Sequence, residues 1–255
     1  MRKERRKAAI TNIGIDGDAR RCVHVCMCRM IAVVSEKPVA CGRFLDELAK
    51  QSCGGVESPH GDGFGAAIFT RGHWFHVREQ CPVWDAARSA LNSIEGTILL
   101  LHSRKASDPT SINLTKLHPF CWPGKGQGIM FCQNGTIRKH DRLKTALGPD
   151  AIDTEKYFDI VIRHYKQTQD LGGAVLAAAK EIEEAGADAT SLNCCISDGH
   201  ELVTYRGKIL PQNAGYHTLY AHEEPGLSVV STEVFSASKP KDWMPLEGIF
   251  RKSYA

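Results

Sequence analysis

Two neighbouring helical segments near the middle of the chain, with strand-like segments on both sides, most constrain what this sequence can fold into. Residues 153–167 ("DTEKYFDIVIRHYKQ") carry apolar residues at helical spacing, with Asp153 and Thr154 as predicted caps. The alanine-rich segment 171–186 ends at Gly186, a typical residue after a helix. Strands that flank a central helical pair favour an α+β fold with stacked sheets over a doubly wound parallel sheet.

The predicted strands are short, apolar or β-branched segments bounded by turn residues. They span residues 29–35, 63–70, 73–79, 96–104 and 128–137 before the helical pair, and 190–198, 200–207, 216–222 and 226–233 after it. Helices are also predicted at 42–52 and 83–94. The strand at 128–137 runs into Asn134-Gly135, a dipeptide typical of a hairpin turn.

Composition and charge exclude several classes of protein. The chain has 255 residues, 42% of them hydrophobic, and can bury a full core without disulfides. Its net charge is +3, but the first seven residues hold five basic groups and one acid, so the remainder is nearly neutral. We therefore expect no nucleic-acid partner. No apolar run approaches the ~20 residues of a membrane span, and the basic N-terminus lacks the apolar region of a secretory signal. The sequence therefore predicts a cytoplasmic protein that does not bind membranes.

The ten cysteines contain no C-x-x-C pair, the usual signature of zinc ribbons and redox motifs. Most of them lie in apolar runs, which favours buried free thiols in a reducing compartment. Cys22, His24, Cys26 and Cys28 could coordinate a soft metal, but their spacing is tight and a second ligand group is missing. We therefore expect no metal and no cofactor.

Four short stretches at strand ends and a helix start are rich in reactive groups: "MCRM" (27–30), "HSRKAS" (102–107), "FCQNGTI" (131–137) and "DTE" (153–155). Each has a plainer interpretation when taken alone. A cysteine before a strand is usually a small buried group, Asn-Gly is usually a turn, and "DTE" is usually a helix cap.

Taken together and in this order with "SPHGDGFGAAIF", "LHPF" and "SDGHELVTYR", the stretches resemble the class II glutamine amidotransferases, which are N-terminal nucleophile hydrolases. The likeness is to their short, stand-alone branch, which opens with Met-Cys-Arg, and it runs from Cys28 to about residue 235. It implies a four-layer α/β/β/α sandwich of two antiparallel sheets between helices. Lys105 stands where the synthase-fused branch has Trp, which argues against that branch.

The resemblance also implies a role for each matching residue. Cys28 would be the nucleophile, while the side-chain amide of Asn134 and the backbone N–H of Gly135 would stabilise the oxyanion. Arg104 would bind the substrate carboxylate, and Asp153 its ammonium group. Ser107, where the family usually has Thr, keeps the hydroxyl near the substrate, and His102 would line the pocket. For His102, a histidine satisfied within its own loop is the alternative.

An N-terminal nucleophile needs a free α-amine on Cys28, so the sequence divides into an extension, 1–27, and an amidotransferase domain, 28–255. We interpret the extension as a mis-called start before Met27 or as a propeptide. Its first 20 residues are polar and basic, which indicates weak order. Residues 21–27 are expected near the cleft because they are tied to the nucleophile.

The predicted reaction is amide hydrolysis that releases ammonia and glutamate through a γ-glutamyl thioester. The substrate is glutamine, with a separate synthase subunit as the partner that takes the ammonia. Alternatively, the enzyme hydrolyses a modified γ-glutamyl compound by itself. A third alternative is a binding or scaffold protein that retains the fold without catalysis.

Overall fold

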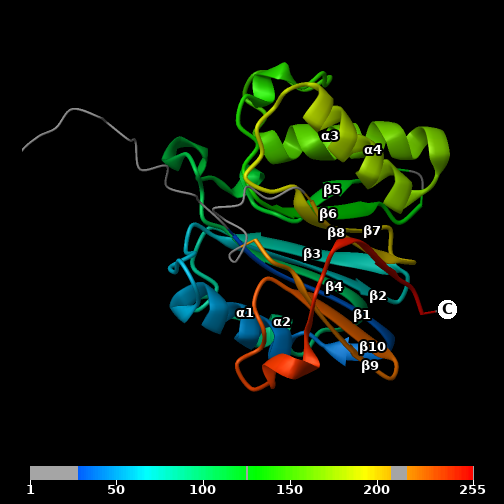
Figure 1. The fold of residues 1–255 in the computed structure, drawn as a ribbon. Helices are drawn as coiled ribbons and strands as arrows, with labels where there is room; N and C mark the ends of the chain where they lie inside the picture. The colour runs from blue at the N-terminus through cyan, green and yellow to red at the C-terminus, as the bar shows by residue number, and fades with distance from the viewer. Residues whose placement is uncertain (1–27, 125, 208–216, 255) are drawn as a thin grey trace, which may run out of the picture.

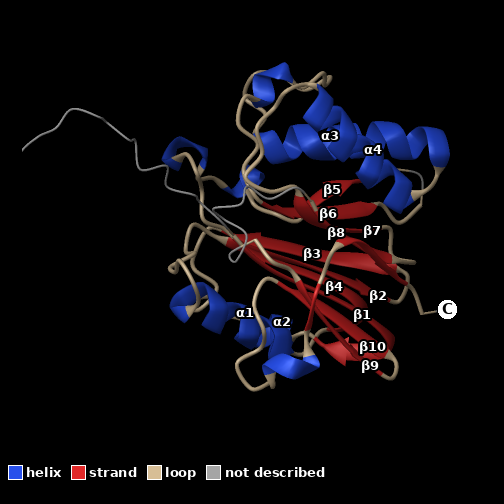
Figure 2. Ribbon diagram, viewed as in Figure 1, coloured by secondary structure: helices blue, strands red, loops and turns tan. Residues whose placement is uncertain are grey.

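The computed structural model describes residues 28–124, 126–207 and 217–254. These residues form two antiparallel sheets stacked face to face, with helices covering both outer faces (Figures 1 and 2). The first sheet has the order β11-β9-β10-β1-β4-β2-β3 and the second has the order β12-β8-β7-β6-β5. The predicted α/β/β/α sandwich is confirmed.

The first sheet contains β1 (Arg29–Ala40), β2 (Phe64–Thr70), β3 (His73–Glu79), β4 (Glu95–Ser103), β9 (Tyr220–Glu224), β10 (Leu227–Ser231) and β11 (Met244–Pro245). The second contains β5 (Phe120–Trp122), β6 (Ile129–Asn134), β7 (Asn193–Ser197), β8 (Leu202–Arg206) and β12 (Gly248–Lys252). The α-helices are α1 (Gly42–Gly54), α2 (Ser89–Asn92), α3 (Asp153–Thr168) and α4 (Leu171–Glu184). Short 3₁₀ turns lie at Pro109–Ser111, Leu114–Lys116, His140–Arg142 and Pro240–Asp242.

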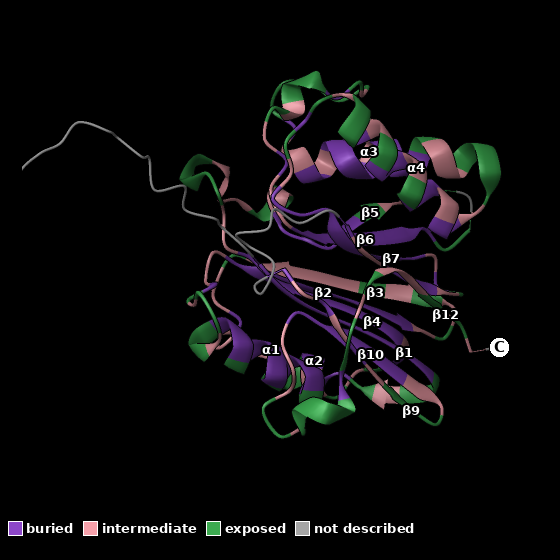
Figure 3. Cartoon of the chain, in the orientation of Figure 1, coloured by how far each residue is buried: buried purple, intermediate pink, exposed green. Residues whose placement is uncertain are grey.

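Three buried apolar clusters hold the four layers together. One lies between α3, α4 and the second sheet, one lies between the two sheets, and one lies between α1 and the first sheet. Figure 3 shows buried residues along the central strands of both sheets and on the inner sides of the helices, whereas the edge strand β3 is mostly of intermediate burial. Each fully buried aliphatic side chain stabilises the fold by about 1.5–3 kcal/mol.

Strand β1 contributes to two of these clusters because its side chains alternate between the faces of the sheet. Ile31 and Val33 pack against the α1 layer, whereas Met30 and Ala32 face the second sheet. The same alternation turns Cys28, the residue before β1, toward the second sheet. Strand β1 therefore directs Cys28, the predicted nucleophile, toward β6.

Most predicted elements are confirmed, and one is mostly wrong. Of the helix predicted at 83–94, only Ser89–Asn92 is helical. Residues before it form turns in which Asp85 N donates to Pro82 O and Arg88 N donates to Ala86 O. Val83 is nevertheless fully buried against the α1 layer, so tertiary packing uses its apolar surface without a regular helix.

Two further local predictions are wrong. Asn134-Gly135 does not form a hairpin turn, because β6 pairs with β5 and β7 and the chain continues toward α3. Asp153 and Thr154 are not the cap of α3, whose N-cap is Ile152. The carboxylate of Glu155 instead accepts a hydrogen bond from Ile152 N at 2.8 Å, which satisfies the first free amide of the helix.

Candidate active site

Cys28 lies at the edge of the space between the two sheets, against the end of β6. It is 8% exposed. Its backbone N donates to Asn134 Oδ1 at 3.1 Å, and its Sγ lies 3.8 Å from the carbonyl oxygen of Lys105. These contacts join the start of β1, the end of β6 and the loop after β4 around one thiol.

Only the oxygen of the Asn134 side-chain amide forms a hydrogen bond among the described residues. The side chain is fully buried, and its Oδ1 accepts the hydrogen bond from Cys28 N. Its Nδ2 is buried and has no hydrogen-bond partner among the described residues. A buried donor without a partner costs about 1–3 kcal/mol and requires a physical explanation.

Gly135 follows Asn134 at a position that excludes other residues. Its φ is +155°, and a Cβ built on it would lie 2.1 Å from Ser191 O. A side chain would therefore collide with the backbone just before β7. This close approach fixes the end of β6, which carries the amide of Asn134.

Arg104, Ser107 and Asp153 line one cleft of about 510 Å³, which also contacts the turns at 109–116. The Arg104 guanidinium is 6% exposed; its Nη1 donates to Ser111 O at 2.8 Å and its Nη2 to Ser111 Oγ at 2.7 Å. Within the described part of the chain, no carboxylate forms an ion pair with Arg104. A planar guanidinium held by neutral partners is suited to bind an incoming carboxylate.

Asp153 is the first residue of α3, where its carboxylate accepts two backbone hydrogen bonds. Ile137 N donates to its Oδ2 at 2.7 Å, and Thr154 N donates to its Oδ1 at 2.9 Å. Burial raises the pKa of this carboxyl, whereas these two bonds act in the opposite direction. The bonds fix the carboxylate at the cleft, where its remaining lone pairs can accept from a cation.

His102 does not reach the cleft. It lies on β4 with a fully buried ring, and its Nε2 is 3.1 Å from Gln133 O and 2.9 Å from His118 Nδ1. Burial lowers the pKa of His102 to about 3, so the ring is neutral at pH 7. The structure places His102 behind β6 as part of a buried histidine pair.

Burial also sets the state of the thiol. It raises the pKa of Cys28 to about 11, although the Lys105 carbonyl contact and then the charge of Arg104 act in the opposite direction. A thiol with this pKa is almost entirely protonated at pH 7. An additional base is therefore needed before the sulfur can act as a nucleophile.

Other residues shape the site without motif signals strong enough to assign them a role from sequence. Asp62 Oδ2 accepts from Ala106 N at 2.7 Å, which braces the loop that carries Arg104 and Ser107. This agrees with the structural role expected from its Gly-rich segment. Ser111 holds Arg104, and only its nearness in sequence could have suggested the contact.

The family model of class II glutamine amidotransferases matches residues 27–220. The chain belongs to this family. The predicted family resemblance is therefore confirmed. A comparison with curated protein sequences finds no match.

Solved structures share the amidotransferase fold at low sequence identity. A predicted glutamine amidotransferase from Pseudomonas aeruginosa has a TM-score of 0.57 and 15% identity, with 89% of this chain and 97% of that chain covered. A glutamine amidotransferase class II domain protein from Silicibacter pomeroyi has a TM-score of 0.53 and 19% identity, with 89% and 99% covered. The glutamine phosphoribosylpyrophosphate amidotransferase of B. subtilis has a TM-score of 0.63 and 12% identity; 89% of this chain matches 49% of that one.

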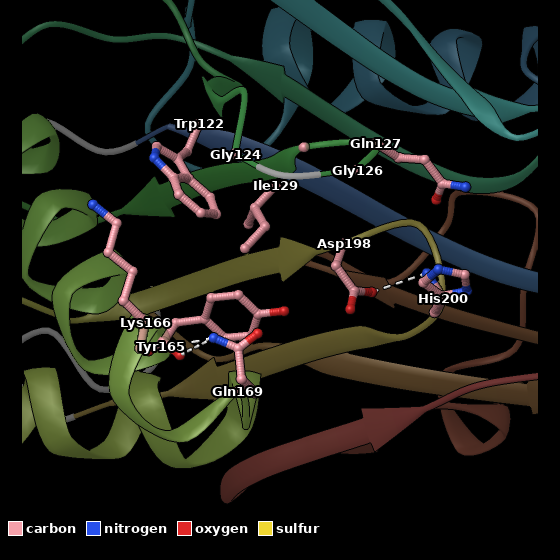
Figure 4. Close-up of a pocket in the computed structure, with 11 residues that line it drawn as sticks. Trp122, Gly124, Gly126, Gln127, Ile129, Tyr165, Lys166, Gln169, Asp198 and His200 are labelled. Carbon is pink, nitrogen blue, oxygen red and sulfur yellow. Dashed lines mark hydrogen bonds between the residues drawn. The ribbon is translucent and has the colours of Figure 1, made fainter.

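A larger hollow of about 690 Å³ lies away from the residues that the family resemblance singles out (Figure 4). It is lined by Trp122, Tyr165 and Asp198 among others, near Ile129 at the start of β6, whereas Asn134 is at the end of that strand. Although this hollow is larger than the cleft at Arg104, we do not assign it as the active site, because it lies at the other end of β6 from Asn134.

The described residues contain no cluster of three or more metal-ligating side chains, and their eight cysteines are free thiols. Of the four residues considered as soft-metal ligands, Cys22, His24 and Cys26 lie outside the described residues, as does the N-terminal extension at 1–27. In the part of the chain that the structure describes, no helix is long and apolar enough to cross a membrane.

Proposed function

We propose that this amidotransferase hydrolyses the side-chain amide of glutamine through a γ-glutamyl thioester on Cys28. The observation that carries the proposal is the unpartnered, buried Nδ2 of Asn134 in the side chain that contacts Cys28. A donor held ready in this way suits an oxygen that becomes negative only during reaction.

The proposed base is the α-amino group of Cys28, freed by cleavage of the Met27–Cys28 bond. Such an amine has an ordinary pKa of about 7.7–8.0, so much of it is neutral near pH 8. It takes the proton from the Cys28 thiol, and the thiolate attacks the amide carbon. The ammonium then returns the proton to the leaving nitrogen, the C–N bond breaks and ammonia departs. Water, activated by the same amine, hydrolyses the thioester to glutamate and the free thiol.

The cleft supplies the proposed grip on the amino acid part of the substrate. Arg104 binds the α-carboxylate with its planar fork, and Asp153 accepts from the α-ammonium group. Ser107 is exposed at the same cleft, where its hydroxyl can reach the bound carboxylate. For His102 we propose a supporting role instead, because its Nε2 lies 3.1 Å from Gln133 O on β6.

Two versions of the reaction fit this site. A separate synthase subunit takes up the ammonia released from glutamine, or the enzyme acts alone on a modified γ-glutamyl compound. Both require the same thioester on Cys28, so a first experiment tests the common step.

The experiment compares the full 255-residue chain with protein that begins at Cys28, made by starting translation at Met27. We expect glutamate release, and labelling of Cys28 by a diazo-ketone analogue of glutamine, only in the form that begins at Cys28. Cys28→Ala should abolish both signals, whereas the matched change of an exposed thiol, Cys53→Ala, should leave them intact. Equal labelling and turnover in the two forms would refute the role of the α-amine.

A further inference from the structure

Arg29 places a buried positive charge directly behind the nucleophile. Its side chain is 1% exposed, and its Nη1 donates to the carbonyl oxygen of Cys28 at 3.3 Å. Its Nη2 lies 2.5 Å from Glu233 Oε1 and also donates to Val56 O. Arginine is rarely buried to this extent unless it is paired, and here its carboxylate partner follows β10, far away in sequence.

The carboxylate of Glu233 is itself held in place. Its Oε1 accepts from Val56 N at 2.9 Å, and its backbone oxygen accepts from Gln51 Nε2 at 3.1 Å. A Cβ on Gly55 would lie 2.7 Å from both carboxylate oxygens, so the glycine leaves room for the acid. The end of α1 and the segment after β10 therefore form a built pocket for the Arg29 guanidinium.

Arg29 cannot act by touching the substrate. It shares the β1 face of Ile31 and Val33, toward α1, whereas Cys28 faces the second sheet. Its influence on the reaction must pass through the Cys28 carbonyl and through its charge.

We propose that Arg29, held by Glu233, is a positioning residue that fixes the Cys28 backbone and supplies the positive charge that keeps the α-amino group of Cys28 unprotonated near neutral pH. This inference rests on the proposed function, in which that amine is the base.

Among the described residues, the charged side chains that act on Cys28 or on Arg29 include groups from four parts of the fold. Arg29 lies on β1, Arg104 on the loop after β4, Asp153 on α3 and Glu233 after β10. Against the effect of burial, the two arginines lower the pKa of the Cys28 thiol, and Asp153 raises it. A cation that favours the thiolate also disfavours an ammonium on the same residue.

Neighbouring histidines do not compete with this charge. Burial and then the charge of Arg29 lower the pKa of His60, to about 3, and that of His217, to about 4. Both rings are therefore neutral at pH 7. Lys105, whose carbonyl contacts the sulfur, directs its Nζ away to Glu57 O at 2.7 Å.

The test measures kcat/KM for glutamine against pH in protein that begins at Cys28. Arg29→Gln should move the acidic limb to higher pH by about one to two units, because a unit charge about 6–12 Å away at an effective dielectric constant of about 20 shifts a pKa by this amount. Glu233→Gln removes the opposing charge and should move the limb to lower pH. The double variant should lie between the two, and Arg29→Lys should retain the wild-type limb with a lower rate.

A second measurement separates this inference from the proposed function. In the full chain, the rate of Cys28 alkylation by iodoacetamide, followed by mass spectrometry, should shift along the pH axis in the same two directions. If the pH profiles do not shift, or shift in the same direction in both single variants, the role of Arg29 is refuted even if glutamine is hydrolysed. If no form hydrolyses glutamine, the proposed function fails. The pH profiles of alkylation then decide by themselves whether the charge of Arg29 acts on Cys28.

Discussion

Asn134 should contribute far more to turnover than to stability, and its neighbour Asn193 provides the matched control. The two asparagines face each other across β6 and β7, and both are fully buried. Asn193 is satisfied on both sides, since its Nδ2 donates to His217 O at 2.6 Å and its Oδ1 accepts from Gly207 N at 3.1 Å. Asn134 accepts from Cys28 N, but its Nδ2 has no partner among the described residues.

The magnitudes follow from these contacts. Asn193→Ala removes the hydrogen bonds that this side chain makes to two buried backbone groups and should lower the free energy of unfolding by about 2–5 kcal/mol. Asn134→Ala removes the acceptor of the Cys28 backbone N–H, which destabilises the fold. It also removes a buried donor without a partner, which costs about 1–3 kcal/mol in the wild-type protein. Because the two effects oppose each other, the free energy of unfolding should change by about 1 kcal/mol or less. Loss of one oxyanion donor should lower kcat about 10²–10³-fold, or about 2.7–4 kcal/mol.

The assay combines urea unfolding of the full chain with glutamate release by protein that begins at Cys28. Both alanine substitutions remove the same atoms, so the cost of the cavity is similar in the two variants. Equal destabilisation by the two substitutions would mean that Asn134 Nδ2 is paired in solution. Unchanged kcat in Asn134→Ala would refute the oxyanion role directly.

Three further predictions concern the cleft, the end of β6 and the buried histidines. Arg104→Lys should raise KM for glutamine more than it lowers kcat, because it retains the charge and loses the planar fork; equal effects on both constants would contradict this role. Gly135→Ala should destabilise the protein by several kcal/mol, measured by thermal unfolding, because its Cβ would meet Ser191 O at 2.1 Å; a Tm within 2 °C or so of wild type would refute the close approach. Burial lowers the pKa of His60 to about 3, so the folded state binds fewer protons than the unfolded state, in which the pKa is about 6.5. The stability that neutral His60 contributes is complete above pH 6.5 and is lost as the pH falls, by about 2 kcal/mol at pH 5. His60→Gln should remove this part of the pH dependence of the free energy of unfolding in urea. An unchanged pH dependence in the variant would contradict the prediction.

The order of predicted helices and strands favoured stacked sheets, and the family resemblance implied the four layers, but neither predicted every element within them. Residues 30–34 of β1 are all apolar, which indicates a strand that is buried on both faces, and the fold buries both. The segment 83–94 has helical spacing, yet Pro82 accepts a turn hydrogen bond from Asp85 N and the helix forms only at its end. Local spacing predicts which residues are buried better than it predicts the backbone that buries them.

The short strands β5, β11 and β12 were not predicted, because their pairing depends on distant partners. Strand β12 completes the second sheet by pairing with β8, and β11 pairs with β9 at the edge of the first. A strand of two to five residues at a sheet edge carries little periodic signal of its own.

The two facing asparagines show what the sequence left open. The family resemblance marked Asn134 within "FCQNGTI" as an oxyanion donor, but the sequence did not show which hydrogen bonds either amide makes. Asn193 is satisfied by His217 and Gly207, which lie beyond β7, so its donor and acceptor are committed to the fold. Asn134 lies opposite, bonded to Cys28 on one side only. Counting donors and acceptors requires the three-dimensional structure. That count leaves Asn134 Nδ2 without a partner among the described residues, unlike Asn193 Nδ2, and it is why we propose Asn134 as the oxyanion donor.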